Sequence, residues 1–393
     1  MTSSQTETVH KSELHHKTVE LSIVMPCLNE AQTLGICIQK AAAYLQKYDV
    51  SGEIVIADNG STDGSQAIAQ NLGVRVIHVE EKGYGSALMA GISAAQGEYV
   101  IMGDADDSYD FSDLTLFLKE LRGGYDLVMG NRFKGGIKPG AMPRLNRLGN
   151  PILTGIGKLF FPNPCGDFQC GLRGFSKKAI ESLNLRTTGM EFASEMVVKA
   201  TLNKLHMTEV PTTLSPDGRN RPPHMRPLRD GWRNLRFYLL YSPRWLFLYP
   251  GLFLMGIGFV GVSLLSFRRW GIFDIHTLLF LATSLIIGSQ AIMFSILTKY
   301  FAINAKLLPY NPWFEEKIRY FTLERGAISG LFLVLAGVAG SFYAFGIWQA
   351  NAFGGLDPFR IMRIAIPSIT SLIIGFQVII GSFFLSVLAL KRK

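Results

Sequence analysis

Hydrophobic and polar positions follow two different patterns along the 393 residues of this chain. Up to about residue 240, short apolar runs alternate with longer stretches in which apolar residues recur at helical spacing. From residue 247 the chain instead contains four long apolar segments without charged residues, at 247–267, 277–298, 327–348 and 364–390. Each exceeds the roughly 18–20 residues that a helix needs to span a bilayer. The pattern therefore predicts a globular domain followed by four transmembrane helices.

The globular part is expected to alternate strands with helices. Strands are predicted at 21–25, 53–57, 74–79, 99–102 and 126–129, and helices at about 31–47, from about 61, and at 86–95. Ser61 or Thr62 is placed to cap the second helix. This alternation implies an α/β fold with a mostly parallel sheet, in which ligands bind beyond the carboxyl ends of the strands.

Polar clusters follow directly after four of these strands. They are Asn29-Glu30, Asp58-Asn59, residues 104–107 and Asn131-Arg132. Because the carboxyl ends of parallel strands meet at one edge of a sheet, we expect these clusters to converge. The turn at 82–85, KGYG, either cradles a phosphate or is only a tight turn, and its glycine spacing disfavours a dinucleotide-binding fold.

The acidic cluster after the fourth strand has the composition of a metal site. Asp104 and Asp106 are two residues apart, so in extended backbone their side chains point the same way. Two carboxylates on one side suit Mg²⁺ or Mn²⁺ held together with a substrate diphosphate. The alternative is an acidic turn that only contacts solvent.

Composition narrows the class of protein. The chain is 48% hydrophobic with a mean hydropathy of +0.22 and a net charge of +9. The positive charge is concentrated beside the apolar segments, which favours a lipid surface over nucleic acid as its partner. The four cysteines form no C-x-x-C pair and no zinc site with histidine, so reduced thiols are expected. Residues 1–18 are polar, lack the apolar core of a signal peptide, and are expected to be a disordered tail.

Four motifs in this order resemble a known family. They are IVMPCLNE at 23–30, ADNGSTDGS at 57–65, GDAD at 103–106 and GNRF at 130–133. Together they look like inverting GT-A glycosyltransferases, and among these like the dolichyl-phosphate mannose and glucose synthase type, over residues 20–240. The resemblance implies that one group of residues holds the nucleotide: Pro26, Leu28, Glu30, Asp58, Asn59 and Asp104. It also implies that Asp104 and Asp106 hold the metal and the diphosphate.

The resemblance extends to a later motif. In the family a D-x-x-x-G-x-R-x-F pattern lines the active site, and Asp167, Gly171, Arg173 and Phe175 match it. By the same resemblance Glu191 lies near the site, whereas Glu195 is expected to be structural. The predicted catalytic set is Asp167, Arg132, Arg173 and Glu191. Arginine grips phosphate in a bidentate manner, so an acceptor phosphate is expected on Arg132, Arg219 and Arg221.

Two amphipathic stretches lie outside the motifs. Residues 143–161 place basic residues among leucines and isoleucines, as a core helix or as an interfacial helix near the acceptor. Residues 217–244 hold seven arginines, with Trp232, Leu235, Tyr238, Leu239 and Leu240 at helical spacing. A basic helix with such an apolar face is expected in the membrane interface, and the alternative is a solvated charged helix.

Charge also predicts the topology. Fifteen Lys and Arg residues flank the apolar segments on the side of the globular domain, against four in the other two loops. The positive-inside rule then places the catalytic domain and both termini in the cytosol, at the inner membrane if the cell is bacterial. The expected divisions are 1–18 tail, 19–216 GT-A domain, 217–246 juxtamembrane segment and 247–393 membrane domain. Small residues such as Gly337 and Ser341 permit a homo-oligomer without specifying one.

Three functions compete at this stage. The first is an enzyme that transfers a hexose from a nucleotide sugar to a polyprenyl or dolichyl phosphate with inversion. Either UDP or GDP could carry the sugar, because uracil and guanine each offer N–H donors to Asp58. The second is a processive polysaccharide synthase, which carries Q-x-x-R-W; here Arg244-Trp245 is present, but Tyr241 stands in place of Gln. The third is a scaffold with a decayed site, which the intact acidic and basic residues argue against.

Overall fold

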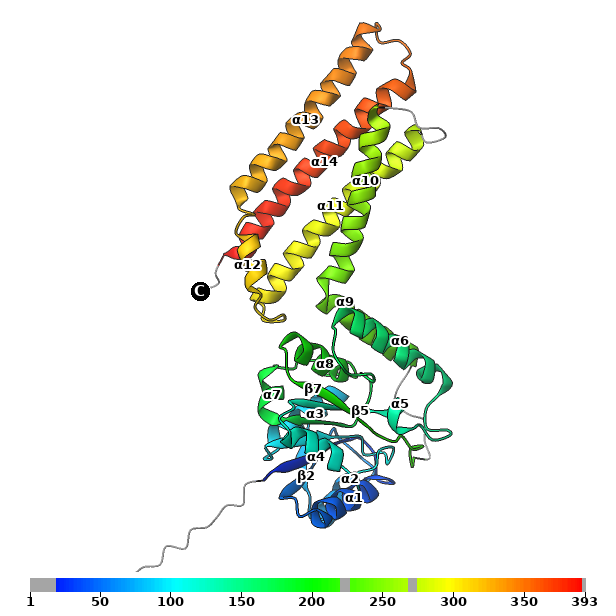
Figure 1. Cartoon of the computed structure of the whole chain (residues 1–393), viewed down its shortest axis with the longest axis vertical. Helices are drawn as coiled ribbons and strands as arrows, with labels where there is room; N and C mark the ends of the chain where they lie inside the picture. Colours follow the sequence, from blue (N-terminus) through cyan, green and yellow to red (C-terminus); the bar gives the residue numbers. More distant parts are fainter. Residues whose placement is uncertain (1–18, 220–226, 268–273, 391–393) are drawn as a thin grey trace, which may run out of the picture. The chain divides into compact units, whose positions relative to one another are not determined.

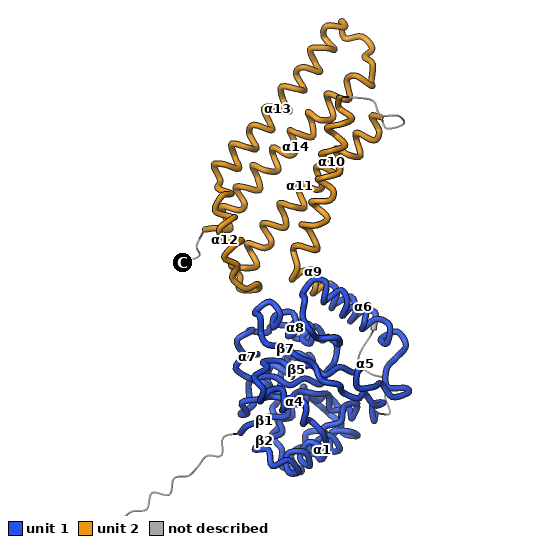
Figure 2. The backbone as a smooth tube through the Cα atoms, viewed as in Figure 1, with its two compact units in different colours: residues 1–235 blue, residues 236–393 orange. Residues whose placement is uncertain are grey.

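The computed structural model describes residues 19–219, 227–267 and 274–390. The chain forms two compact units, residues 1–235 and 236–393 (Figure 2). The tail expected at 1–18 lies outside the described residues, as does Arg221.

In its described residues, the first unit is built on a seven-stranded sheet of order β3-β2-β1-β4-β6-β5-β7. Figure 1 draws this unit in the colours from blue to green. Its strands are β1 Leu21–Cys27, β2 Gly52–Asp58, β3 Arg75–His78, β4 Tyr99–Met102, β5 Leu127–Asn131, β6 Arg173–Ser176 and β7 Met207–Pro211. Neighbouring strands are parallel except at β6, which is antiparallel to both β4 and β5. The predicted mostly parallel sheet is therefore confirmed.

Helices cover both faces of this sheet. They are α1 Leu34–Lys47, α2 Ser65–Asn71, α3 Tyr84–Ala94, α4 Thr115–Arg122, α5 Arg132–Gly135, α6 Arg144–Phe160, α7 Lys177–Ser182 and α8 Phe192–Leu202. Side chains of α1 and α4 share one core with Ile23 and Ile101. On the other face, Gly91 of α3 lies directly against Val24 and Ala57. Both faces of the central strands are thus buried, which explains their continuous apolar sequence.

All five predicted strands are present, but two details of the prediction are wrong. The second helix begins at Ser65 after Gly64 as N-cap, so neither Ser61 nor Thr62 caps it. Ser61 instead accepts a hydrogen bond from the Asn29 backbone N–H at 2.9 Å. The sequence also did not reveal β6 and β7, because their few residues become strands only by pairing with distant partners.

The four predicted membrane helices are confirmed. After α9 Pro227–Tyr241 come the π-helical turn η1 Arg244–Leu248, α10 Tyr249–Phe267, α11 Ile275–Asn304, α12 Pro312–Ile318, α13 Leu323–Ala350 and α14 Pro358–Ala389. Within residues 19–219, 227–267 and 274–390, four helical stretches are long and apolar enough to cross a membrane, at Arg244–Phe267, Ile275–Asn304, Leu323–Ala350 and Pro358–Ala389. Gly337 is buried against α14, where an added Cβ would lie 2.6 Å from the Ser368 carbonyl oxygen. This small residue therefore serves packing within the chain.

Candidate functional site

The carboxyl ends of β1, β2 and β4 bring the predicted polar clusters to one edge of the sheet. Cys27 and Asp58 are register partners at the ends of β1 and β2. The Asn59 backbone N–H donates to the Cys27 carbonyl at 2.9 Å, which ties the two loops together. Glu30 and Asp106, from the loops after β1 and β4, both bind Arg219. Three loops that are far apart in sequence thus meet at one place.

Asp58 is held firmly in the loop after β2. Its side chain is buried and accepts hydrogen bonds from the Gly60 and Ser61 backbone N–H groups and from Gln66 at 2.6 Å. The Asn59 side chain stabilises the neighbouring backbone, because its amide donates hydrogen bonds to the Val79 and Glu81 carbonyls. Pro26 and Leu28, the other residues predicted to hold the nucleotide, are half-buried beside them.

The turn at 82–85 is a tight turn. The Gly83 N–H donates to the Asn59 side chain at 2.7 Å, and the Gly85 N–H donates to the Thr188 carbonyl at 2.8 Å. These amides are occupied within the protein, so the phosphate-cradle alternative is not favoured. The turn instead places Tyr84, whose hydroxyl donates to Asp104 Oδ1 at 3.0 Å.

Asp104 lies in a crowded, low-dielectric position. Burial, followed by the charge of Asp106, raises the pKa of the Asp104 carboxyl to about 7. Its other oxygen faces Gly171, where an added Cβ would lie 2.6 Å from Oδ2. The glycine of the later motif is therefore required by the close approach of this carboxylate.

The neighbouring carboxylates have different environments. Asp106 Oδ1 accepts hydrogen bonds from the Ser108 backbone and hydroxyl, while Oδ2 lies 2.8 Å from Arg219. Asp107 adopts a φ of 61° and turns away to pair with Lys40 at 2.7 Å. Of the three acidic residues, Asp104 and Asp106 therefore remain the candidates for the site, as the sequence predicts.

These two carboxylates suit a divalent cation whose remaining ligands come from the substrate. Among residues 19–219, 227–267 and 274–390, no group of three or more His, Cys, Asp or Glu side chains could hold a metal by itself. Mg²⁺ and similar cations are commonly bound by one or two carboxylates together with substrate phosphates. A positively charged guanidinium already lies on Asp106, which indicates that this position accommodates a cation.

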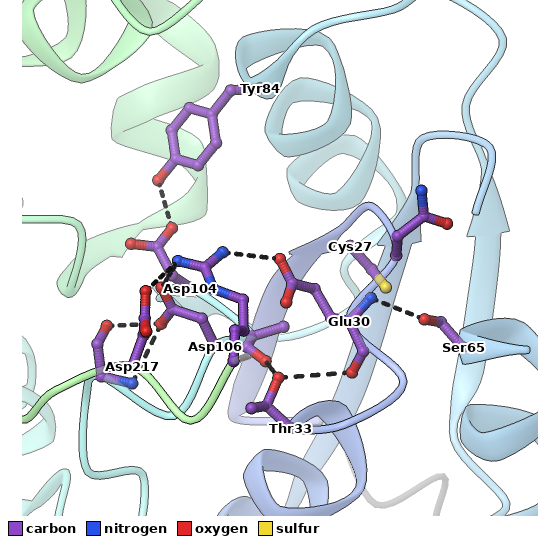
Figure 3. Close-up of polar contacts among 12 residues, drawn as sticks. Cys27, Glu30, Thr33, Ser65, Tyr84, Asp104, Asp106 and Asp217 are labelled. Atoms are coloured by element: carbon purple, nitrogen blue, oxygen red, sulfur yellow. Dashed lines mark hydrogen bonds and ion pairs between the residues drawn. The ribbon is translucent and has the colours of Figure 1, made fainter. Parts of the chain in front are cut away.

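Arg219 reaches this position from the segment after β7. The Gly218 N–H donates to the Asp106 carbonyl at 3.0 Å, and an added Cβ at Gly218 would lie 2.9 Å from Thr33. Arg219 then contacts Glu30 at 3.0 Å and both Asp106 and Asp217 at 2.8 Å. Figure 3 shows Glu30, Asp106 and Asp217 pointing toward one another, with Asp104 beside them.

A buried ion pair adjoins the site. Arg132 donates to Asp167 through its backbone N–H, Nε and Nη2 at 3.2, 2.7 and 2.8 Å. Burial lowers the pKa of Arg132, but the Tyr109 and Asp167 charges outweigh it and raise that pKa well above its usual range. Both Asp167 oxygens are occupied by Arg132, so this carboxylate is arranged to orient the guanidinium.

The two remaining predicted catalytic residues, Arg173 and Glu191, differ in burial, since Arg173 is buried and Glu191 is half-buried. Arg173 is fully buried and donates to the Cys170, Ala193 and Phe168 carbonyls. It therefore fixes the backbone of the Asp167 loop. Glu191 precedes α8 and has one buried oxygen without a hydrogen-bond partner among the described residues. Glu195 is saturated by Lys199 and the 186–187 segment, as expected of a structural residue.

Sequence reasoning missed several supporting residues. Thr33 donates to the Ala105 carbonyl at 2.7 Å, and the Gly171 N–H donates to the Tyr109 hydroxyl at 2.8 Å. Tyr84 orients Asp104. The only sequence signal for Tyr84 was its place between two glycines at the start of a helix. Thr33 and Tyr109 carried no signal, since their partners are remote in sequence.

The amphipathic stretches differ in exposure. On α6 the apolar stripe Leu145, Leu148, Ile152 and Leu159 is exposed, by as much as 67% at Leu148. The opposite side, at Thr154 and Gly157, packs on Phe168. The core-helix alternative for 143–161 is therefore wrong.

On α9 Trp232 is exposed, but Tyr238 is fully buried, so the prediction of an interfacial Tyr238 is wrong.

Comparisons with known proteins identify the family. A model described as glycosyl transferase family 2 matches residues 22–183, and one described as the glycosyltransferase family 2 C-terminal transmembrane region matches residues 296–389. The chain is 35% identical to the low-salt glycan biosynthesis hexosyltransferase Agl6 of Haloferax volcanii, over 95% of this chain and 93% of that protein. The chain belongs to glycosyl transferase family 2.

Two further matches accompany this family assignment. A dolichyl-phosphate hexose transferase of Haloferax volcanii is 31% identical over 49% of this chain and 81% of its own length. Glucosyl-3-phosphoglycerate synthase from Mycobacterium tuberculosis, solved with Mn²⁺, UDP and phosphoglyceric acid, aligns at 22% identity with a TM-score of 0.42, over 56% of this chain and 76% of that one. The family assignment and the four apolar helices of the described residues make this chain a membrane glycosyltransferase with an α/β domain.

Proposed function

We propose that this glycosyltransferase moves a hexose from a UDP- or GDP-linked sugar to a polyprenyl or dolichyl phosphate, with inversion. The observation that carries the proposal is the meeting of Asp104, Asp106 and Arg219 at the carboxyl edge of the sheet, beside the Arg132–Asp167 pair. Acidic and basic groups at one edge suit a diphosphate donor and a phosphate acceptor. The name of the dolichyl-phosphate hexose transferase among the relatives supports the acceptor class.

The donor nucleotide is assigned to the loops after β1 and β2. Asp58 is oriented by three backbone or side-chain donors and can accept from base N–H groups or ribose hydroxyls. Pro26, Leu28, Glu30 and Asn59 complete the expected pocket. Asp104 adjoins both the nucleotide and the diphosphate.

Asp104 and Asp106 would hold Mg²⁺ or Mn²⁺ together with the donor diphosphate. Such a cation neutralises the charge that develops on the leaving diphosphate. Tyr84 and Ser108 keep the two carboxylates in place. This arrangement agrees with a site that has two protein ligands and takes the others from substrate.

The acceptor oxygen needs little help from a base. A phosphate monoester has a second pKa of about 6, so it is largely dianionic near pH 7. One of its oxygens forms the new bond to the anomeric carbon while the bond from that carbon to the diphosphate breaks, and the nucleoside diphosphate leaves with the electron pair. Arg132, oriented by Asp167, would hold the dianion in line, with Arg219 and Arg221 as further phosphate ligands. Arg173 would position the loop, and the unpartnered oxygen of Glu191 supports a role near the sugar.

The exposed stripe of α6 supports contact with the lipid surface. Arg144, Arg147 and Lys158 lie on the same helix as the stripe, and Trp232 and Arg233 are exposed on α9. Apolar residues flanked by cations are typical of helices in the membrane interface. The proposal keeps residues 19–216 as catalytic domain, 217–246 as juxtamembrane segment and 247–393 as membrane domain. It places the catalytic domain and both termini in the cytosol by the positive-inside rule.

A nucleotide-release screen tests the proposal. The purified full chain is incubated with labelled UDP- and GDP-sugars, Mg²⁺, and either polyprenyl phosphate or buffer. Release of one nucleoside diphosphate that depends on polyprenyl phosphate supports the proposal. Release with polymer formation and without the lipid would instead indicate the processive synthase, and no release under any condition would indicate a scaffold.

A further inference from the structure

Arg219 lies where the proposed metal site needs a cation. Its guanidinium is 2.8 Å from Oδ2 of Asp106, a carboxylate that we assign above to a divalent cation. Its side chain is only 11% exposed, so this is an enclosed contact rather than a surface pair. A guanidinium and a divalent cation on the same carboxylate oxygen repel each other, because both are positively charged. Binding of the metal should therefore weaken the contact between Asp106 and Arg219.

The contacts of Arg219 leave it incompletely satisfied. Among the described residues, Arg219 contacts three carboxylates, Glu30, Asp106 and Asp217. Its Nε is buried without a hydrogen-bond acceptor in the same part of the chain. Buried donors without acceptors are costly, and carboxylates that converge on one position favour a divalent cation. The arrangement holds Arg219 in place but favours its replacement by a divalent cation.

We propose that Arg219 is a displaceable counterion of the metal site, which leaves Asp106 when the metal and the donor diphosphate bind and then becomes available to the acceptor phosphate. This inference rests on the proposed function: on its metal site for the first step and on its phosphate acceptor for the second. It gives the reaction an order, because the acceptor cannot use Arg219 until the donor has released it. Gly218 stays bound to the Asp106 backbone at 3.0 Å, so only the arginine side chain has to move.

Metal binding in the absence of nucleotide tests the first step. Mn²⁺ is titrated into the purified full chain, and free Mn²⁺ is measured by electron paramagnetic resonance. Arg219→Gln is expected to tighten Mn²⁺ binding at least tenfold, and Arg219→Lys by less, since lysine keeps the charge but cannot contact three carboxylates at once. Thermal melting of each variant checks that it is folded.

The matched control is Lys40→Gln. Lys40 is a nearby cation that pairs with Asp107 and leaves Asp106 untouched. Its loss removes the same charge without freeing the metal ligand, so it should change the Mn²⁺ affinity less than threefold. Equal tightening in Lys40→Gln and Arg219→Gln, or weaker binding in Arg219→Gln, would overturn the proposal.

The second step is tested with farnesyl phosphate as the acceptor probe. Calorimetry of the wild-type protein should detect its binding only after Mn²⁺ with UDP or GDP is present. Equal binding without them would overturn the order. Failure of the proposed function is distinguishable: the Mn²⁺ results would then stand while no sugar reaches a lipid phosphate.

Discussion

Three aspartates with the same chemistry have different environments in this site. Asp104, Asp106 and Asp107 follow one strand, yet the first accepts a hydrogen bond from Tyr84, the second binds Arg219 and the third pairs with Lys40. The left-handed backbone at Asp107 separates it from the other two. The role of each carboxylate therefore follows from its backbone position.

This difference predicts the outcome of two matched substitutions. Asp106→Asn should reduce turnover at least about 100-fold while the protein stays folded, because the neutral amide holds a divalent cation much more weakly than the carboxylate. Asp107→Asn should reduce turnover by less than about fivefold, since it loses only a partly exposed pair with Lys40. Sugar transfer and thermal melting are measured for both. Full wild-type activity in excess EDTA would contradict the metal assignment.

The Arg132–Asp167 pair predicts how the free energy of unfolding responds to substitution. Asp167→Asn leaves a buried guanidinium without its counter-charge, at a cost of about 3–5 kcal/mol, and the Arg132→Met/Asp167→Leu double variant should recover most of it without recovering activity. The same pair predicts a pH effect. If the acceptor dianion is the nucleophile, the transfer rates of the wild type and of Asp167→Asn should fall in parallel below about pH 6. A folded, substrate-binding Asp167→Asn enzyme without activity beside an active Arg132→Ala enzyme would point to Asp167 as the base.

Sequence could indicate the residue types of the site but not all of their contacts. The acidic loop and the Asp58 loop were predictable because each directly follows an apolar strand. The binding of Arg219 to Glu30 and Asp106 was not, since its partners lie 189 and 113 residues away. The motif predicted Arg173 as a catalytic residue, whereas the structure buries its side chain and directs it to three backbone carbonyls.

Elements with one dominant pattern were predictable, and elements that depend on remote pairing were not. The strands β1 to β5 and the four membrane helices carry their own apolar signal. The four residues of β6 become a strand because they pair antiparallel with both β4 and β5. The short helix α12, with Trp313 exposed, was also not predicted.

The exposed stripe of α6 predicts a specific defect in acceptor use. Leu148→Glu with Ile152→Glu should raise the apparent KM for a long-chain polyprenyl phosphate more than fivefold and leave the KM for the nucleotide sugar within twofold. Both side chains are more than half exposed, so folding should not suffer. Leu116→Glu, an exposed leucine on α4, is the control and should change neither constant. Equal increases in both constants would indicate misfolding.

At the scale of the whole molecule, the charge asymmetry predicts the topology. Fifteen basic residues flank one side of the four helices and four flank the other. A reporter fused after Lys393 should therefore indicate the cytosol, and one inserted at Ala352, between α13 and α14, should indicate the opposite side. Both reporters on the same side would refute the assignment of the last helix.

The central claim is that one hexose is transferred to a lipid phosphate. The most direct measurement is mass spectrometry of the lipid product after incubation with the nucleotide sugar that the release screen selects. The account predicts a single species, polyprenyl phosphate plus one hexose, that forms with Mg²⁺ and disappears with Asp106→Asn. A ladder of hexose additions, or sugar polymer without modified lipid, would contradict it.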